Sequence, residues 1–462
     1  MTVGALFPSP AEVEANTPAS RDRAIDVIRI VSLVGVVVGH TIMATSIISD
    51  DVLFWSNLLT ASVVFQALTW VFQIMPLFFF AGVAACVDPP PQAGGRPACE
   101  GSAPGHTGDS WGNWLMRRCT RLYRPVFYYL AFWISALAIL RYFLPEHVYE
   151  PVAGISIQLL WFLGAYVLVL AAVPLLTRIT TTARLFGAVA GTYALIAVVD
   201  AVRINVDGLP AVAYLNLVAW LIPGMLGVAY RRHLLAGRAA LMLAAVMFVV
   251  NLSLMWVGPY ELSLVGIETQ QLKNMTPPSL LLAGHAIILC ALAIAAAPAI
   301  ARWAKRPRVW WLAAIGNSGA MTLYLWHIPA LLAMHLVFDY LGHPRYDPSA
   351  AGFTPLSILQ LVIMACLVAT VFVALRPLEK NPLPLWDGGF VSAPGSRSAA
   401  VGALLCVAGA ATLASVGWGL KDQGLYCVAV MLAALIAARS LAGDRPVTTQ
   451  RVCAAGLPAG TR

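Results

Sequence analysis

The sequence predicts an all-α membrane protein, a polytopic bundle of ten core transmembrane helices with two more near the C-terminus. Hydrophobic residues make up 60% of the chain and charged residues only 11%, whereas ordinary soluble domains carry roughly 25% charged residues. The apolar residues gather in runs of about 20, the length with which a helix crosses about 30 Å of hydrocarbon. Lys and Arg lie mainly in alternate connections between these runs. A water-soluble fold is therefore excluded.

Twelve such runs follow one another along the chain. Ten form the expected core, and the last two are rich in Ala, Val and Leu. The expected spans are 26–46, 62–86, 125–144, 155–176, 185–201, 211–230, 239–257, 279–300, 312–337, 355–375, 399–419 and 424–441.

The Lys and Arg residues of the connections set the orientation of the bundle. With the N-terminus in the cytoplasm, 24 of the 29 Lys and Arg residues fall on the cytoplasmic side. The reverse orientation would invert this bias, so we expect a multi-pass protein of the cell membrane with a cytoplasmic N-terminus. The five cations expected outside are Arg141, Arg203, Lys273, Arg345 and Lys421.

The chain divides into four expected segments. Residues 1–24 are polar and lack the apolar core of a cleaved signal peptide, which indicates a disordered cytoplasmic tail. The membrane domain covers 25–388, and its stretch 88–113, rich in Pro, Gly and Ser, reads as a flexible cytoplasmic loop. A C-terminal pair of transmembrane helices (389–445) and a cytoplasmic tail (446–462) complete the chain.

Several site classes lack support in the sequence. None of the eight cysteines forms a CxxC pair, so they are expected to be small buried hydrophobes. There is no HExxH, phosphate-binding Gly-rich loop or GxSxG elbow, so neither a metal site nor a serine nucleophile is expected. The net charge of +8 is not arranged as a basic stripe with interleaved aromatics, so nucleic acid is not an expected partner. The preference for Arg over Lys and the many alanines suggest a GC-rich bacterial source.

The first span contains ionisable residues that hydrocarbon disfavours by several kcal/mol unless they are paired or hydrated. Arg29 and His40 are 11 residues apart, which places them on one helix face about 16 Å apart. Asp26 lies three residues before Arg29 and is spaced to pair with it. Two interpretations stay open: a snorkelling Arg with a hydrogen-bonded interior His, or a His placed to act as a general base.

The ninth span carries a second polar group. It contains Gly316-Asn317-Ser318, and then Tyr324 and His327, which share a helix face. This group is either a polar contact that joins helices or a second wall of the same polar cavity. Two further histidines, His285 and His335, are expected to pack in the interior.

A basic cluster precedes the third span. Its members are Arg117, Arg118, Arg121 and Arg124. The cluster is either a topology anchor on anionic lipid or a cradle for a phosphorylated ligand, because guanidinium groups match phosphate oxygens.

Taken in order, these stretches resemble the acyltransferase-3 family of integral membrane acyltransferases. The family's first span is marked by a basic residue and a histidine with ten residues between them, as in Arg29 and His40. Two positions depart from the family pattern, because Leu159 stands where a His is expected and 222–227 lacks a His-Gln pair. The resemblance covers roughly residues 22–388. Its other matching stretches are Met75–Gly82, Arg117–Pro125, Leu160–Leu163, Asn274–Pro278 and Gly316–His327.

The resemblance implies an O-acyltransferase that moves an acyl group, acetyl or another short acyl, from acyl-CoA to a hydroxyl of a carbohydrate or glycosylated acceptor. His40 is implied as the general base, and Arg29 as the residue that holds or orients the donor. No permanently bound cofactor is expected, and the oligomeric state stays open. Supporting or donor-binding roles are implied for Asp26, Arg118, Arg121, Arg124, Tyr324 and His327.

Two other classes of protein fit the composition. A transporter or flippase for a glycolipid or small molecule would also have many spans with polar residues near the midplane, although the two halves show no internal repeat. An accessory membrane subunit would have little need of Arg29 and His40 on one face. Acyl-CoA-dependent product formation would count against a transporter, and tolerance of substitutions at both Arg29 and His40 would favour an accessory subunit.

Overall fold

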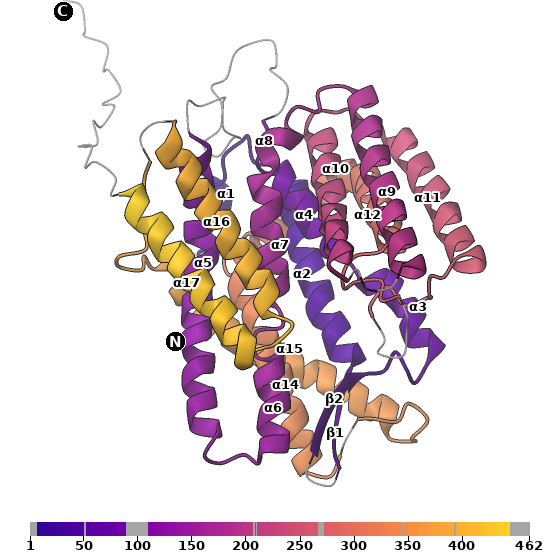
Figure 1. Cartoon of the computed structure of the whole chain (residues 1–462), viewed down its shortest axis with the longest axis vertical. Coiled ribbons are helices and arrows are strands. Elements are labelled where there is room, and N and C mark those ends of the chain that lie inside the picture. Colours follow the sequence, from indigo (N-terminus) through magenta and orange to yellow (C-terminus); the bar gives the residue numbers. More distant parts are fainter. Residues whose placement is uncertain are drawn as a thin grey trace, which may run out of the picture.

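The chain folds as a bundle of long helices, described here in a computed structural model (Figure 1). The structure describes residues 7–49, 52–88, 110–206, 208, 210–266, 272–343, 345–391 and 394–443. In that part of the chain, 12 helical segments are long and apolar enough to cross a membrane, which confirms the predicted all-α polytopic class. The C-terminal tail 446–462 and residues 89–109 of the expected loop lie outside the described residues.

Nine of the spans are single helices: α2 (Arg23–Met43), α5 (Trp111–Leu140), α9 (Thr182–Asn205), α11 (Gly237–Val257), α12 (Leu280–Trp303), α14 (Ala320–Tyr340), α15 (Phe353–Lys380), α16 (Ser396–Ser415) and α17 (Asp422–Ala442). Three spans are each built from two consecutive elements: α3 (Val63–Phe72) with α4 (Met75–Ala84), α6 (Glu146–Ile155) with α7 (Leu160–Ala171), and the 3₁₀ helix η2 (Pro210–Trp220) with α10 (Leu221–Arg231). Three short helices, α1 (Pro10–Ala15), α8 (Val173–Leu176) and α13 (Pro307–Asn317), lie between spans or before the first.

The third span begins far earlier than residue 125, where it was expected. Ser110 caps α5 by accepting a hydrogen bond from the backbone N–H of Asn113, and the helix then runs without a break through Pro125. The basic cluster therefore lies on the first turns of α5 and not in a connection. Hydropathy placed the start of this span too late, because charged residues lower the mean hydropathy even where the helix continues.

The N-terminal segment was expected to be disordered, and for residues 7–22 this is wrong. Ser9 and Glu12 form a reciprocal capping box that starts α1. Trp310 on α13 donates its indole N–H to the hydroxyl of Thr17 at 2.8 Å. A local cap and an anchor 293 residues away in sequence thus order a segment whose composition alone suggested a tail.

A two-stranded antiparallel hairpin follows α2 and was not predicted. The first span was expected to reach residue 46, but α2 ends at Met43 and β1 (Ala44–Ser49) pairs with β2 (Val52–Asn57). In this register Ser46 lies directly opposite Trp55. Figure 1 shows the hairpin at the lower end of the bundle, which we call the hairpin end.

Arg345 explains why α2 can stop where it does. This residue was expected to be an exterior loop cation, but it is only 2% exposed. Its guanidinium donates to the carbonyl oxygens of Thr41 at 3.3 Å and Ala44 at 2.9 Å, and also to that of Ile42. These carbonyls would otherwise be left without partners at the end of the helix.

The two C-terminal helices, expected as a transmembrane pair after the ten core spans, pack against those spans. In Figure 1, α16 and α17 lie beside α5 and α7. Tyr123 on α5 contacts Thr412 on α16 through their hydroxyl groups at 3.2 Å. The backbones of α7 and α16 approach closely, because a Cβ added to Gly164 would lie 2.5 Å from the carbonyl oxygen of Gly409.

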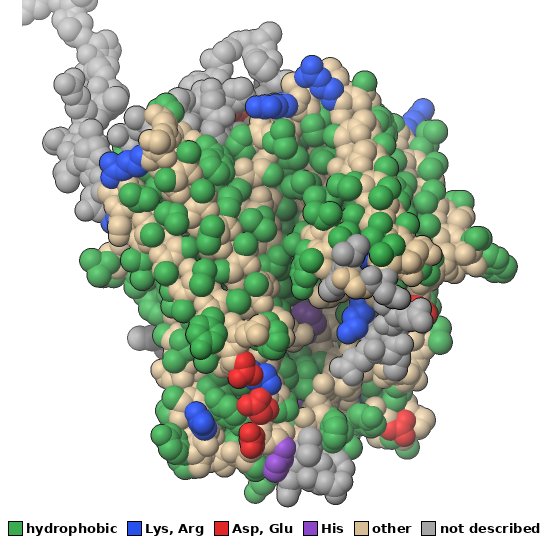
Figure 2. Space-filling view, in the orientation of Figure 1, with side chains coloured by type: hydrophobic (Ala, Val, Ile, Leu, Met, Phe, Trp, Pro, Cys, Tyr) green, Lys and Arg blue, Asp and Glu red, His purple; other side chains and the backbone are tan. Residues whose placement is uncertain are grey.

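Charge is distributed unevenly between the two ends of the bundle. Figure 2 shows Lys and Arg side chains at the upper end of this face, whereas the acidic side chains lie towards the hairpin end together with some basic ones. The upper end carries the start of α2 and of α5, and we call it the basic end.

Candidate active site

Two histidines from distant parts of the chain meet inside the bundle. His40 lies on the last turn of α2, and His327 lies seven residues into α14. Nδ1 of His40 and Nε2 of His327 are 2.9 Å apart. Their ring planes are nearly parallel, 14° apart, and the ring centroids are 5.2 Å apart. The predicted second wall of the first-span cavity is therefore a direct hydrogen-bond partner of His40.

The backbone fixes which ring nitrogens carry protons. Nδ1 of His327 lies 2.7 Å from the carbonyl oxygen of Tyr324 and 3.2 Å from that of Leu323, so it must be the N–H donor. Nε2 of His327 then accepts, and Nδ1–H of His40 donates to it. The neutral form of His40 is therefore left with its lone pair on Nε2, the arrangement that a general base requires.

The two imidazoles differ in exposure. His327 is 1% exposed, whereas the side chain of His40, on the last turn of α2, is exposed. Figure 2 shows a histidine side chain within a hollow near the middle of the face. Gly39, the residue before His40, lets α3 pack closely against α2, because a Cβ added to Gly39 would lie 2.9 Å from Cβ of Phe72. His40 is thus the member of the pair that a substrate can reach.

An apolar pocket is lined by sequence neighbours of this pair, although by neither histidine itself. It has a volume of about 160 Å³ and lies between α2, α14 and α15. Its wall includes Thr41, which follows His40, and Leu323, whose carbonyl accepts from His327. Most of the remaining wall is made of Val, Leu and Met side chains. Such a lining suits a short hydrocarbon chain.

Two arginines of the predicted donor-binding set lie near each other at the basic end. The positive charges of Arg118 and Arg29 both act on Cys86 and on Tyr166. Burial raises the pKa of the Cys86 thiol, and the two charges oppose that rise. Arg118 also lies over the ring of Trp114, 4.5 Å from the ring centroid. Arg29 has no hydrogen-bond or ion-pair partner among the described residues, so its half-buried guanidinium is available to an anion.

The pairing expected between Asp26 and Arg29 is wrong. The Asp26 carboxylate instead accepts two hydrogen bonds from Arg21, at 2.6 Å and 3.0 Å. Arg21 precedes the helix and folds back over its first turn, where its guanidinium takes up both oxygens of the carboxylate. Asp26 therefore joins the first turn of α2 to Arg21, and it does not neutralise the charge of Arg29.

The rest of the basic cluster divides into two kinds of residue. Arg124 forms an ion pair with Asp387 and donates to the carbonyl oxygen of Glu379 at 2.9 Å, so it joins α5 to the end of α15. Arg121 has an exposed side chain on the same helix. Of Arg118, Arg121 and Arg124, it is Arg118 whose charge acts on the same groups as that of Arg29.

Tyr324 is placed in the helix interface rather than in the hollow. It is 3% exposed, and its hydroxyl donates to the carbonyl oxygen of Leu159 at 2.8 Å. This bond joins α14 to the start of α7. Its support of the site is indirect, through the backbone carbonyl that holds His327. His285 is packed in the interior as expected, with its ring edge against Trp70.

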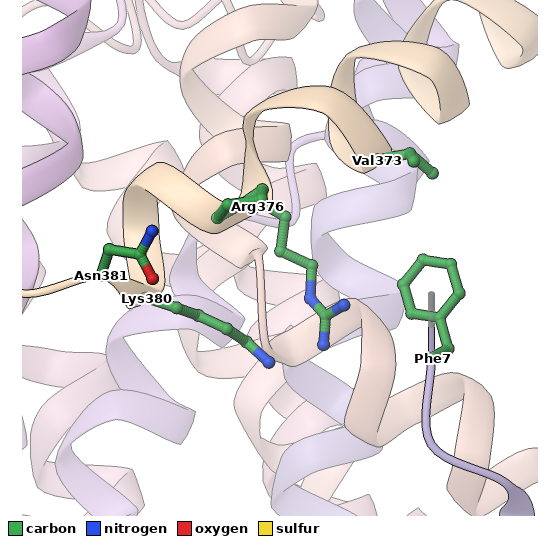
Figure 3. Close-up of a pocket in the computed structure, with 6 residues that line it drawn as sticks. Phe7, Val373, Arg376, Lys380 and Asn381 are labelled. Carbon is green, nitrogen blue, oxygen red and sulfur yellow. The ribbon is translucent and has the colours of Figure 1, made fainter. Parts of the chain in front are cut away.

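A second pocket, which is basic and has a volume of about 190 Å³, lies beside the C-terminal part of α15 (Figure 3). Arg376 and Lys380 project from α15 towards it, and the ring of Phe7 closes one side. The guanidinium of Arg376 lies 4.9 Å from the Phe7 ring centroid and donates to Ser318 at 2.8 Å. None of the residues lining this pocket comes from α2 or α14, so it is separate from the histidine pair.

Comparison with known protein families identifies most of the chain. A family model described as an acyltransferase domain, Acyl_transf_3, matches residues 22–377, which include α2, α14 and most of α15 but not α16 or α17. No curated protein matches the chain. No solved structure matches it either.

Proposed function

The chain belongs to the acyltransferase-3 family and is a membrane acyltransferase, and we propose that it transfers a short acyl group from acyl-CoA to a hydroxyl of a carbohydrate or glycosylated acceptor. The observation that carries the proposal is the hydrogen bond between His40 and His327. It leaves Nε2 of an accessible imidazole as the proton acceptor.

In the proposed reaction the acceptor hydroxyl attacks the thioester carbonyl carbon while Nε2 of His40 takes the hydroxyl proton. The tetrahedral intermediate then collapses, the C–S bond breaks, and the CoA thiolate leaves with the proton that His40 returns. The products are an ester and free CoA. Nδ1–H of His40 remains bonded to His327 throughout, so the imidazolium formed in between keeps its orientation.

Two features support a short acyl group on an anionic donor. Arg29 and Arg118 place two guanidinium groups at the basic end, and such groups suit the phosphates of CoA. The apolar pocket between α2, α14 and α15 has a volume of about 160 Å³, and a cavity of about 150 Å³ holds one benzene molecule. The pocket therefore suits an acyl chain of few carbons.

The uneven charge supports a location in the cell membrane with the basic end in the cytoplasm. Acyl-CoA would then reach Arg29 from the cytoplasm, and the acceptor would approach His40 from the hairpin end. The membrane thereby separates the two substrates until they meet at the histidine pair.

The test is an acyl-transfer assay with the His40→Ala protein in proteoliposomes. Loss of the general base is expected to lower kcat by about 10²–10⁴-fold. His147→Ala, an exposed histidine on α6, is the matched control and should retain activity. Full activity in a correctly inserted His40→Ala protein would overturn the mechanism.

The acceptor is to be found by mass spectrometry of envelope glycans and secreted metabolites from cells with and without the protein. The expected difference is the loss of an acyl mass from one glycan or glycoside. A transporter would instead move that compound across vesicles without acyl-CoA and leave its mass unchanged.

A further inference from the structure

A second polar cluster, which the proposed chemistry does not use, lies between the hairpin and α14. Its members are Ser46 and Trp55, opposite each other on β1 and β2, and His335 and Asp339, one turn apart on α14. Directly opposite residues of an antiparallel pair project to the same face of the sheet. Residues four apart likewise share a helix face. The two faces meet, because the Trp55 and His335 rings are 5.4 Å apart in an edge-on arrangement.

The hydrogen bonds of this cluster leave two acceptors unused. The hydroxyl of Ser46 lies 2.6 Å from Oδ2 of Asp339 and donates to that carboxylate. The same hydroxyl oxygen then accepts from Nδ1–H of His335 at 3.2 Å. Nε2 of His335 and Oδ1 of Asp339 are both buried and have no hydrogen-bond partner in the described part of the chain.

Such buried acceptors carry a free-energy cost unless a donor reaches them. His335 is 1% exposed and packs in the interior as expected, and there it also takes part in this hydrogen-bonded cluster. The missing donors must match a carboxylate oxygen and an imidazole nitrogen side by side. Neighbouring hydroxyl groups of a sugar ring have that chemistry, and the half-buried ring of Trp55 offers an apolar face beside them.

The cluster lies on the hairpin side of the histidine pair. His335 follows His327 by eight residues on the same unbroken helix, which is a rise of about 12 Å. Ser46 follows His40 in the same direction along the chain. A molecule that contacts both places must therefore be extended over about this length.

We infer that Ser46, Trp55, His335 and Asp339 form a subsite for hydroxyl groups of an extended carbohydrate acceptor, some 12 Å from the hydroxyl that is acylated at His40. This inference rests on the proposed acyl transfer to a carbohydrate. It assigns the acceptor to the hairpin end and selects an oligosaccharide or glycoside over a small single-ring alcohol.

The experiment measures steady-state transfer in proteoliposomes, with unacylated glycan from cells that lack the protein as the acceptor and acetyl-CoA as the donor. The variants are Asp339→Asn, His335→Gln and Trp55→Ala, with Trp55→Phe as the conservative change. Each of the first three variants removes a proposed contact with the acceptor. The KM for the glycan is expected to rise about ten- to a hundredfold, while kcat and the KM for acetyl-CoA stay within about twofold. Trp55→Phe should keep a KM near that of the wild type.

Matched controls are His343→Gln and Asp347→Asn, which change exposed residues beyond the same end of α14. They should leave all three constants unchanged. An unchanged glycan KM in Asp339→Asn and His335→Gln would overturn this inference alone, as would a loss of kcat with a constant KM, which marks a structural role. A wild-type protein that transfers no acyl group to any glycan would overturn the proposed function itself.

Discussion

At the scale of single residues, the site depends on a neutral relay rather than on an ion pair. A backbone carbonyl holds the proton on Nδ1 of His327, and this makes Nε2 of His327 the acceptor for His40. No carboxylate is needed to select the tautomer of His40. A neutral partner also avoids burying a charge within the membrane, which would cost several kcal/mol.

His327 can be tested by a pair of substitutions. In His327→Gln the amide oxygen can occupy the place of Nε2 and accept from His40, whereas His327→Phe keeps a ring but offers no acceptor. We expect the Phe variant to lose about a hundredfold in kcat and the Gln variant to keep most of the activity. Steady-state transfer by the purified, monodisperse proteins measures both. Equal losses in the two variants would show that His327 only fills space.

Part of this site was predictable from the sequence, and part was not. The shared face of Arg29 and His40 follows from helix geometry alone, because α2 is unbroken between them. The direct contact with His327 could not be derived, because 287 residues separate the two histidines and no periodicity specifies which faces of two helices meet. The ion pair predicted between Asp26 and Arg29 was wrong. Spacing within the helix identifies Arg29 as a candidate partner, but it does not show that Arg21, which precedes the helix, binds Asp26 instead.

At the scale of elements, the site depends on where α2 stops. The helix ends one turn after His40, and the hairpin that follows carries Ser46 to α14. Arg345 makes this ending stable by taking up the last carbonyl oxygens of α2. Burial lowers the pKa of Arg345 to about 10, so the guanidinium is still charged at neutral pH.

Replacing Arg345 with Lys tests this role. An ammonium keeps the charge, but it cannot reach three carbonyl groups at once as the planar guanidinium does. We expect a loss of at least about 2 kcal/mol in stability, since hydrogen bonds to charged groups are worth about 1.5–3 kcal/mol each. The melting temperature in detergent measures the loss, and kcat should fall while the KM for acyl-CoA is unchanged.

Arg141→Lys is the matched control, because Arg141 was assigned to the same exterior set and is exposed in the structure. It should melt like the wild type. If both variants melt alike, Arg345 does not hold the end of α2.

The spans themselves were predictable because lipid imposes a single requirement, a helix of sufficient apolar length, and this can be read from local composition. The boundaries of the spans were less predictable. Polar residues continue a helix in the first turns of α5, and tertiary contacts end one at Met43. The hairpin depends on Arg345, some 300 residues away in sequence, and no local pattern contains that information.

At the scale of the whole molecule, the two C-terminal helices belong to the fold although the family match ends at residue 377. Residues of α16 and α17 are part of the same hydrophobic core as α4, α7 and α14. The contact between α7 and α16 depends on small residues, which let two helix backbones approach within membranes. The pair therefore has a structural role in this chain, independent of any role in catalysis.

Two glycine substitutions test this structural role by their opposite expected effects on stability. In Gly164→Ala the new methyl group would lie 2.5 Å from the carbonyl oxygen of Gly409 and 2.7 Å from the backbone N of Leu413. Backbone atoms cannot move aside as a flexible side chain can, so α16 must shift and the protein should lose about 1–3 kcal/mol of stability. In Gly187→Ala, on α9, the methyl group meets no atom within 4 Å. This second change should stabilise the helix by up to about 1 kcal/mol, because Ala has the higher helix propensity. Melting temperatures in detergent should therefore move in opposite directions, and a shift of the same sign and size in both would mean that α16 does not pack against α7.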